Sequence, residues 1–216
     1  MPGRRAPEAE RREQILAAAF AVACRQRLEG LTIRAVASEA GLSPGLVLFH
    51  LGSRDELLLG LLDWLLAGTI IGTPDPAVQA RPSARERLLG LIEQELVLIA
   101  ERRPRLELFF DFWVAGISHP KIRGKIRRAL ARYRDAALPL AAAAIAEAPR
   151  AFRGITAPAL AGLAVAVIEG CVMQAVVDPH SLDVAAAMAT LTTMLPAPPR
   201  PRARPRAPRV RTPSRA

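Results

Sequence analysis

Three small or aliphatic residues stand at the spacing that a helix-turn-helix requires. Ala37 is small enough for a second helix to cross the first, and Gly41, four residues later, can take the positive φ of the turn between them. Val47 follows six residues further on, where a buried aliphatic side chain would anchor the second helix, and Leu42 would fill the turn. The pattern predicts a helix whose N-terminal part can enter the major groove of DNA, although ordinary pairs of short helices can share this spacing.

A second group of residues could bind a small molecule in an apolar cavity. Phe109, Phe110, Phe112 and Trp113 cluster on one predicted helix, and Trp64 lies on the helix that joins the two predicted domains. Such aromatic residues can line a pocket that contains a few polar anchors, but they are also the ordinary content of a core. The candidate ligand-binding residues are four aromatic and three polar ones: Trp64, Phe109, Phe112, Trp113, Glu95, Glu169 and Gln174.

No arrangement of residues indicates catalysis. His50, His119 and His180 are scattered, each next to a predicted helix end. The sequence contains no Asp-Asp-x-x-Asp and no Glu-x-x-His, the spacings that metal-dependent helical enzymes use to collect their ligands. We therefore expect no enzyme activity, no metal site and no cofactor.

Helical periodicity and capping residues position these candidates. Thr32 and Ser43 are typical N-caps, and Ser53 and Ser83 each open a capping box. Breaks are expected between helices at Pro104 and at other proline or glycine positions. We predict an all-α fold of nine helices, over 8–28, 33–40, 44–51, 54–71, 83–102, 106–117, 119–147, 157–177 and 181–195.

These helices divide into a three-helix helix-turn-helix DNA-binding domain and a six-helix ligand-binding and dimerisation domain. We place a basic N-terminal arm at 1–7, the DNA-binding domain at 8–53, the second domain at 54–195 and an Arg/Pro-rich tail at 196–216. The tail has almost nothing to bury, so we expect it to be disordered. As a hypothesis, it adds salt-sensitive, non-specific affinity for DNA.

Composition and charge narrow the class of protein. Just over half of the residues are apolar and only 4% are aromatic, which favours helices. The formal net charge is +10, but residues 196–216 carry seven arginines and no acidic residue, so the excess of positive charge is largely local.

Cys24 and Cys171 sit in apolar helical stretches and are expected to be small buried side chains. No secretory signal precedes the first helix, which predicts a cytoplasmic location.

The predicted helix at 157–177 is apolar enough to suggest a membrane span. It contains Glu169 and Gln174 together with Gly162, Gly170 and many alanines, which favour close packing between helices. We therefore expect a core or subunit-interface helix and no membrane partner.

The segment from Leu31 to Leu57 resembles the DNA-binding region of the TetR family of regulators. It has a Thr-capped helix, Ala and Gly around the turn, a Ser-Pro-Gly opening and a Ser-Arg-Asp-Glu-Leu junction, and the resemblance covers about residues 10–60. The helix with Glu169-Gly170, followed by Asp178-Pro179 and a last helix, is similar to many C-terminal domains of this family, of the BetI-like kind. The chain departs from the family at Leu48, where a tyrosine commonly meets a phosphate.

The resemblance implies how the chain would bind DNA. Five residues would face base edges and three would contact or approach phosphates, in this order: Ser43, Pro44, Gly45, Leu46 and Phe49, then Thr32, His50 and Arg54. Leu46 and Leu48 make this helix unusually apolar, so contacts with thymine methyl groups would replace some hydrogen bonds to bases.

The resemblance also implies a repressor that leaves its double-stranded operator when a small-molecule effector binds the second domain. The last two helices carry apolar surface too large for one face of a lone bundle, which predicts a homodimer with a four-helix interface and a near-palindromic operator. The alternative is a ligand-binding helical module that has lost specific DNA binding, for which the apolar run Leu46–Leu48 is the only support.

Overall fold

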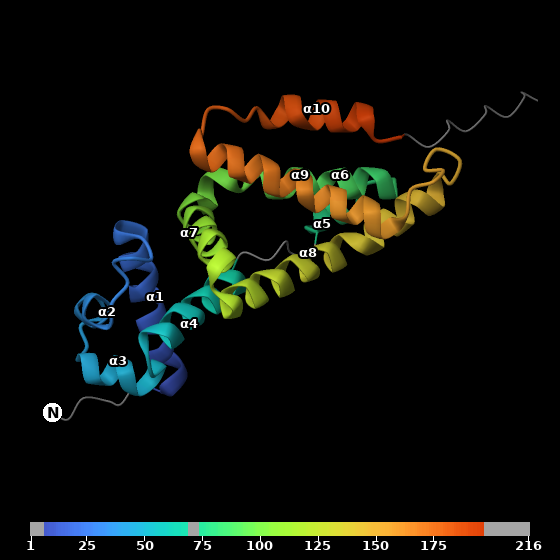
Figure 1. Cartoon of the computed structure of the whole chain (residues 1–216). Helices are drawn as coiled ribbons and strands as arrows, with labels where there is room; N and C mark the ends of the chain where they lie inside the picture. The colour runs from blue at the N-terminus through green and yellow to red at the C-terminus, as the bar shows by residue number, and fades with distance from the viewer. Residues whose placement is uncertain (1–6, 69–73, 197–216) are drawn as a thin grey trace, which may run out of the picture.

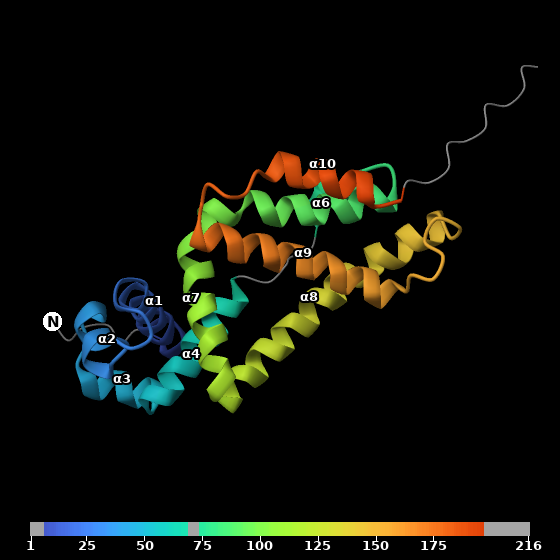
Figure 2. The same ribbon diagram turned by 45° about the horizontal axis from the view of Figure 1, so that its top comes forward.

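The computed structural model describes residues 7–68 and 74–196, and these residues form ten helices. A small N-terminal group of helices lies at one end of the molecule, and a larger helical domain extends away from it (Figures 1 and 2). The all-α prediction is confirmed for the described ranges. The predicted arm, apart from Pro7, the tail beyond 196 and the last residues assigned to the fourth helix lie outside them.

The N-terminal domain consists of α1 (Glu8–Gln26), α2 (Ile33–Ala40) and α3 (Pro44–Leu51). Its core contains Ile15, Val36, Ala37 and Val47, each at most 1% exposed. The first helix ends two residues earlier than predicted, and Arg27 rather than Gly30 adopts the positive φ, at 58°.

Helix α4 (Arg54–Ala67) leads into the second domain, where α5 (Pro76–Gln79) and α6 (Ala84–Val97) follow. Both predicted capping boxes are present, with Ser53 paired with Glu56 and Ser83 paired with Glu86. The prediction of nine helices is wrong by one, because α5 forms a single turn where we expected only a break. Pro76 occupies its first helical position, where no backbone N–H is needed.

The predicted break at Pro104 is wrong, because Pro104 lies inside α7 (Ile99–Ser118). The break falls at Leu98, which caps the end of α6 and the start of α7, so the two helices meet at a corner without a loop. Pro104 lies close to the N-terminus of α7, where the helix loses little more than the hydrogen bond to the carbonyl of Ala100.

The remaining helices are α8 (Pro120–Glu147), α9 (Ala157–Val177) and α10 (Val184–Met194). Helix α9 packs on α8, α6 and α7, while α10 lies along α6 on the outer side (Figures 1 and 2). Arg85 on α6 holds the end of α10 by donating to the carbonyl oxygens of Thr192 and Leu195. Helix α7 stands between this layer and the N-terminal domain.

Helix α9 is the one described helix long and apolar enough to cross a membrane. One of its faces is buried in the domain through Leu160, Ala164, Ile168 and Val172, as expected for a core helix. Its opposite face exposes Leu163 and Val177, which is consistent with the predicted subunit interface but leaves that prediction untested.

Candidate functional site

The helix-turn-helix is built by local hydrogen bonds at the predicted positions. Thr32 Oγ1 accepts a hydrogen bond from the Ala35 N–H at 3.1 Å, and Ser43 Oγ accepts one from the Leu46 N–H at 3.2 Å. Gly41 has φ +66°, the left-handed conformation predicted for the turn. Because both caps lie at exposed helix N-termini, the free amide groups there can bind anionic oxygen atoms.

Helix α3 separates an anchoring face from an exposed face. Val47 and Leu51 are buried, whereas Phe49 is 81% exposed and Leu48 is 44% exposed. Ser43, Pro44 and Gly45 are exposed beside them, and Leu46 is half-buried. The outward surface of this helix therefore offers mainly apolar groups and very few hydrogen-bond donors.

His50 and Arg54 have partners within the protein. The carbonyl oxygen of His50 accepts a hydrogen bond from Arg12 Nη1 at 3.2 Å, and its ring meets Phe49 edge to face. Arg54 donates through Nε to the Leu31 carbonyl at 2.9 Å and through Nη2 to the Leu28 carbonyl at 3.0 Å. These bonds give Arg54 a positioning role between α4 and the loop after α1, while its approach to phosphate stays a prediction.

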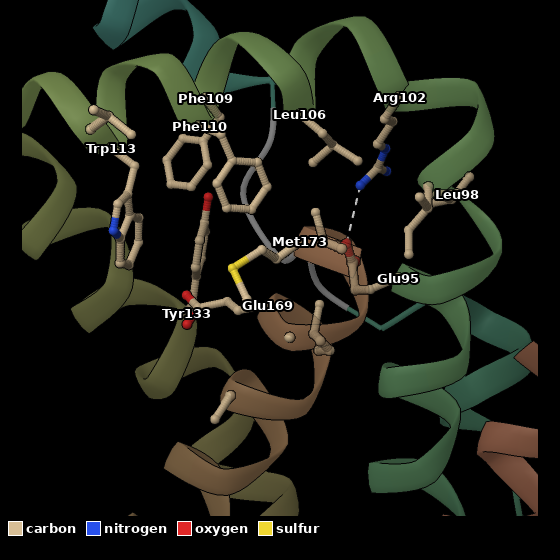
Figure 3. Close-up of a pocket in the computed structure, with 16 residues that line it drawn as sticks. Glu95, Leu98, Arg102, Leu106, Phe109, Phe110, Trp113, Tyr133, Glu169 and Met173 are labelled. Atoms are coloured by element: carbon tan, nitrogen blue, oxygen red, sulfur yellow. Dashed lines mark hydrogen bonds and ion pairs between the residues drawn. The ribbon is translucent and has the colours of Figure 1, made fainter. Parts of the chain in front are cut away.

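The second domain contains a cavity of about 460 Å³ between α6, α7, α8 and α9. Figure 3 shows side chains from all four helices directed toward it. Sixteen residues line it: Glu95, Leu98, Ile99, Arg102, Leu106, Phe109, Phe110, Trp113, Val114, Tyr133, Ala166, Ile168, Glu169, Gly170, Val172 and Met173. The lining is mainly apolar, with rings contributed chiefly by α7.

Few polar groups interrupt this apolar lining. Glu95 is 8% exposed, and its Oε2 atom accepts from Arg102 Nη1 at 3.1 Å (Figure 3). Burial raises the pKa of Tyr133 to about 12, so its hydroxyl stays protonated at neutral pH. Burial also raises the pKa of Glu169, an effect that nearby Arg134 partly opposes.

Glu169 contributes an unsatisfied polar atom to the cavity. Its Oε1 atom is buried and has no hydrogen-bond partner among the described residues. A buried carboxylate oxygen without a partner costs free energy, and a cationic or hydrogen-bond-donating ligand would offset that cost. The aromatic rings of Phe109 and Trp113, 5.9 Å apart between centroids and inclined at 67°, lie in the same cavity.

The structure brings four of the seven predicted ligand-binding residues to this cavity, namely Glu95, Phe109, Trp113 and Glu169. Phe112 is fully buried in the core instead, and Gln174 is exposed, donating to the Gly170 carbonyl on its own helix. Trp64 lies against the N-terminal domain, where its Nε1 donates to Glu13 Oε1 at 2.7 Å.

Arg102, Tyr133 and Met173 also line the cavity, although they were not among the residues predicted from the sequence. Arg102 and Tyr133 sit in charged stretches of α7 and α8, and a long basic segment of helix gives no hint that one of its side chains turns inward. Met173 is an apolar residue of α9, but whether its side chain faces the cavity depends on how α9 packs against α7. No local signal could have identified these three residues.

Helix α7 connects the cavity to the N-terminal domain. Arg27, at the end of α1, pairs with Asp111 and lies 3.9 Å from Glu107 between Nη1 and Oε2. The Arg105 guanidinium lies over the Trp64 ring, 4.4 Å from its centroid, and 5.4 Å from that of Phe20. One helix therefore supplies both cavity-lining residues and contacts to α1.

The described residues contain no cluster of three or more His, Cys, Asp or Glu side chains that could hold a metal ion. Both cysteines are half-buried and unpaired with each other. The organised features are thus an exposed helix and an apolar cavity with an opening to solvent.

Both domains match known families. Residues 15–61 match the family model described as bacterial regulatory proteins, tetR family. Residues 84–197 match the model of the BetI-type transcriptional repressor, C-terminal. A curated relative, the HTH-type transcriptional regulator BetI of Paraburkholderia phymatum, is 26% identical over 113 residues, which are 52% of this chain. The chain spans only 58% of that relative's length in this match.

Solved structures share the fold. A protein from Pseudomonas aeruginosa described as a transcriptional regulator has a TM-score of 0.74 at 20% identity, covering 88% of this chain and 90% of its own. A TetR transcription regulator from Haloarcula marismortui has a TM-score of 0.71 at 19% identity, covering 87% and 97%. A regulator from Saccharomonospora viridis, solved in complex with choline, has a TM-score of 0.70 at 24% identity, covering 86% and 95%.

Proposed function

The chain belongs to the TetR family of bacterial transcriptional regulators, with a C-terminal domain of the BetI type, and from this premise we propose that it is a ligand-released repressor. It binds a near-palindromic operator as a homodimer in the bacterial cytoplasm and leaves the operator when a small organic cation enters the cavity. The observation that carries this proposal is that α7 lines the cavity and also contacts the N-terminal domain, through Arg27 at the end of α1 and through Arg105 over Phe20.

The exposed face of α3 supports DNA binding by apolar readout. Phe49 and Leu48 project from the helix, where they can contact thymine methyl groups in the major groove. Thr32 and Ser43 place two helix N-termini on the same domain, and their free amides can bind phosphates. The phosphate contacts fix the position of the domain, and the apolar contacts supply sequence preference.

Exposed apolar surface on α9 and α10 supports the homodimer. Val177 on α9 is 83% exposed and Met194 on α10 is 75% exposed, although both helices belong to the folded domain. A two-fold interface of these helices would bury them and would set two recognition helices about one DNA turn apart.

The chemistry of the cavity supports an organic cation as effector. Aromatic faces attract alkylammonium groups, and Phe109, Trp113 and Tyr133 supply such faces. Glu169 adds a carboxylate whose buried oxygen has no partner among the described residues, and a cation would favour its ionised form. The regulator from Saccharomonospora viridis was solved with choline, a molecule of this chemical class.

The proposed release is a two-state mechanism. A ligand shifts the equilibrium only if it binds one arrangement of α7 better than the other. Movement of α7 would carry Asp111 and Arg105, and through them Arg27 and Trp64, so α1 and α4 would change orientation together. The separation of the two recognition helices would then no longer match the operator.

Operator binding is tested with DNA from just upstream of the protein's own gene, by fluorescence anisotropy at two salt concentrations. Phe49→Ala should weaken binding by about tenfold, because an apolar base contact is lost. Ile117→Ala, a control at a similarly exposed residue of α7, should leave affinity unchanged. Equal affinity of Phe49→Ala and wild type would contradict the proposed recognition.

The same experiment tests the alternative of a helical module without specific DNA binding. The exposure of Leu48, where the family commonly has tyrosine, favours that alternative because one phosphate contact is missing. Binding that depends only on salt, and not on DNA sequence or on Phe49, would support the module and exclude the repressor.

The effector class is tested by calorimetric titration with choline and with its uncharged isostere, in which a quaternary carbon replaces the nitrogen. We expect choline to bind and the isostere to bind at least about tenfold more weakly, because only the cation interacts with Glu169 and the ring faces. Glu169→Gln should reduce this preference, because the ring faces still attract the cation. Equal binding of the two molecules would rule out a cation site.

A further inference from the structure

The first half of α8 concentrates positive charge. Residues 120–135 contain seven basic residues and only one acidic residue. We call the α8 row the four basic residues that recur at spacings of four, three and four: Lys121, Lys125, Arg128 and Arg132. Residues at these spacings share one side of a helix, where like charges repel one another and destabilise it. An anion bound along the row would offset this repulsion.

Three members of the α8 row line a groove between α8 and α4. The groove has a volume of about 270 Å³ and six lining residues: Asp63, Leu66 and Ala67 from α4, and Lys125, Arg128 and Arg132 from α8. Three cations therefore meet a single carboxylate. Lys125 engages that carboxylate, since its Nζ atom lies 2.6 Å from each oxygen atom of Asp63. The two arginines remain as excess positive charge in the groove.

Neither of these arginines has a carboxylate partner within the chain. Among the described residues, Arg128 and Arg132 form no ion pair and no hydrogen bond, whereas six arginines elsewhere pair with Asp or Glu. All 20 acidic residues of the sequence lie in the described ranges, and the segments outside these ranges contain none. The N–H donors of both guanidinium groups are therefore available to an anion from outside the chain.

The chemistry of the groove favours a phosphate group as that anion. Each guanidinium offers a planar fork of N–H donors that fits two oxygen atoms of a phosphate or a carboxylate. Two forks and a neighbouring ammonium group match an anion that spreads two or three negative charges over several oxygen atoms. A single carboxylate has only two oxygen atoms, so it would engage one fork and leave the other unused.

The groove is separated from the surface proposed to bind DNA. Asp63 stands nine residues after Arg54, which corresponds to roughly 14 Å along α4. The first half of α8 lies beside α4, whereas α3 adjoins the opposite end of α4 (Figures 1 and 2). A duplex in contact with α3 therefore leaves the groove free for a small molecule.

We propose that the groove between α4 and α8 is a second ligand site, which binds a small molecule through a phosphate or diphosphate group held between Arg128 and Arg132. The anion competes with Asp63 for Lys125, so its binding weakens the contact between α8 and α4. The inference goes beyond the proposed function, because none of the residues that line the groove lines the effector cavity.

The site is tested by calorimetric titration of the full chain with inorganic pyrophosphate, at an ionic strength held constant with potassium chloride. We expect one pyrophosphate to bind per chain, and Arg128→Gln, Arg132→Gln to bind it at least about tenfold more weakly. The control Arg127→Gln, Arg150→Gln loses as many charges at exposed residues outside the groove and should keep the wild-type affinity. Absence of saturable binding, or an equal loss in both double variants, would overturn the site.

A gain of affinity provides a test that misfolding cannot imitate. Asp63→Asn removes the carboxylate from the groove and releases Lys125 to the anion, so pyrophosphate should bind about threefold more tightly. Asp75→Asn makes the same change of charge at an exposed residue outside the groove and should leave the affinity unchanged. An Asp63→Asn variant with unchanged or weaker binding would contradict the assigned groove.

A last comparison separates a small molecule from the phosphates of DNA. The salt dependence of operator binding should be the same for Arg128→Gln, Arg132→Gln and for wild type, because the duplex does not reach the groove. A slope of log affinity against log salt reduced by about two would assign both arginines to DNA phosphates and overturn the small-molecule site. Pyrophosphate binding requires neither operator nor choline, so it can hold in a protein that fails both tests of the proposed function.

Discussion

The helix-turn-helix and the α9–α10 pair differ in how completely the chain buries the apolar residues of their helices. Helices α2 and α3 are only eight residues each, yet each begins at a side-chain cap and buries its anchoring residues within the same small domain. Helices α9 and α10 are longer, but none of the α10 residues is buried and one side of α9 stays exposed. A short helix can thus bury its anchoring residues within its own domain, whereas a long apolar helix can keep an exposed face that only a partner would bury.

The largest expected effect contrasts the core of the second domain with the edge of its cavity. Phe112→Ala should lower the free energy of unfolding by about 3–5 kcal/mol, because a fully buried ring is removed and a void remains. Trp113→Ala, one residue along at the cavity opening, should cost clearly less. Urea unfolding followed by circular dichroism measures both. Equal losses would mean that the cavity is as tightly packed as the core.

A smaller effect tests whether local backbone conformation sustains the helix-turn-helix. Gly41→Ala should destabilise the protein by about 1–2 kcal/mol, because residue 41 must keep a left-handed conformation. Gly45→Ala is a matched control, since neither glycine has an atom within 4 Å of an added Cβ but only Gly41 has positive φ. Thermal unfolding of the two variants compares them directly. Similar destabilisation by both would exclude the conformational explanation.

Breaking the contact between α7 and the end of α1 should change stability little. It should have a larger effect on the coupling between effector binding and operator affinity. Asp111→Asn weakens the pair with Arg27 and should lower the unfolding free energy by no more than about 1 kcal/mol. The loss of operator affinity on adding choline should shrink in this variant. Glu39→Gln, which breaks the Arg25–Glu39 pair inside the N-terminal domain, should retain the full response. An unchanged response in Asp111→Asn would exclude this contact as a link.

The smallest effect is a dependence of stability on pH that arises in the cavity. Burial raises the pKa of Glu169 above its ordinary value of 4.5, so protonation favours the folded protein. This contribution is complete below pH 4.5 and is lost as pH rises through the raised pKa. Relative to wild type, Glu169→Gln should therefore gain stability from acid to neutral pH in a series of urea titrations. A difference that stays constant with pH would contradict this assignment.

The predictability of each region follows from the range of the interactions that form it. Thr32, Gly41 and Ser43 act on neighbours three or four residues away, so their roles could be predicted from spacing alone. The corner at Leu98 was misplaced to Pro104 because proline is a strong local signal, while the packing of α6 and α7 that overrides it has none.

The cavity was predictable only in part for the same reason. Phe109 and Trp113 share a helix and were recognised as a cluster, whereas Phe112 between them turns into the core. Trp64 was assigned to the cavity by residue type, but the side chains that it contacts, Glu13 and Arg105, come from distant parts of the chain. Which way an aromatic ring points depends on neighbours that sequence spacing does not reveal.

The corner at Leu98 has a consequence for the rate of the response. Helices α6 and α7 share Leu98 as their cap residue and have no linker between them. Neither helix can therefore move without displacing the other. A displacement that begins beside Glu95 on α6 reaches Arg102 on α7 directly, because no loop between the two helices has to rearrange first. Relaxation-dispersion measurements should accordingly find that the backbone amides of α6 and α7 exchange with a single time constant, because the two helices move as one unit.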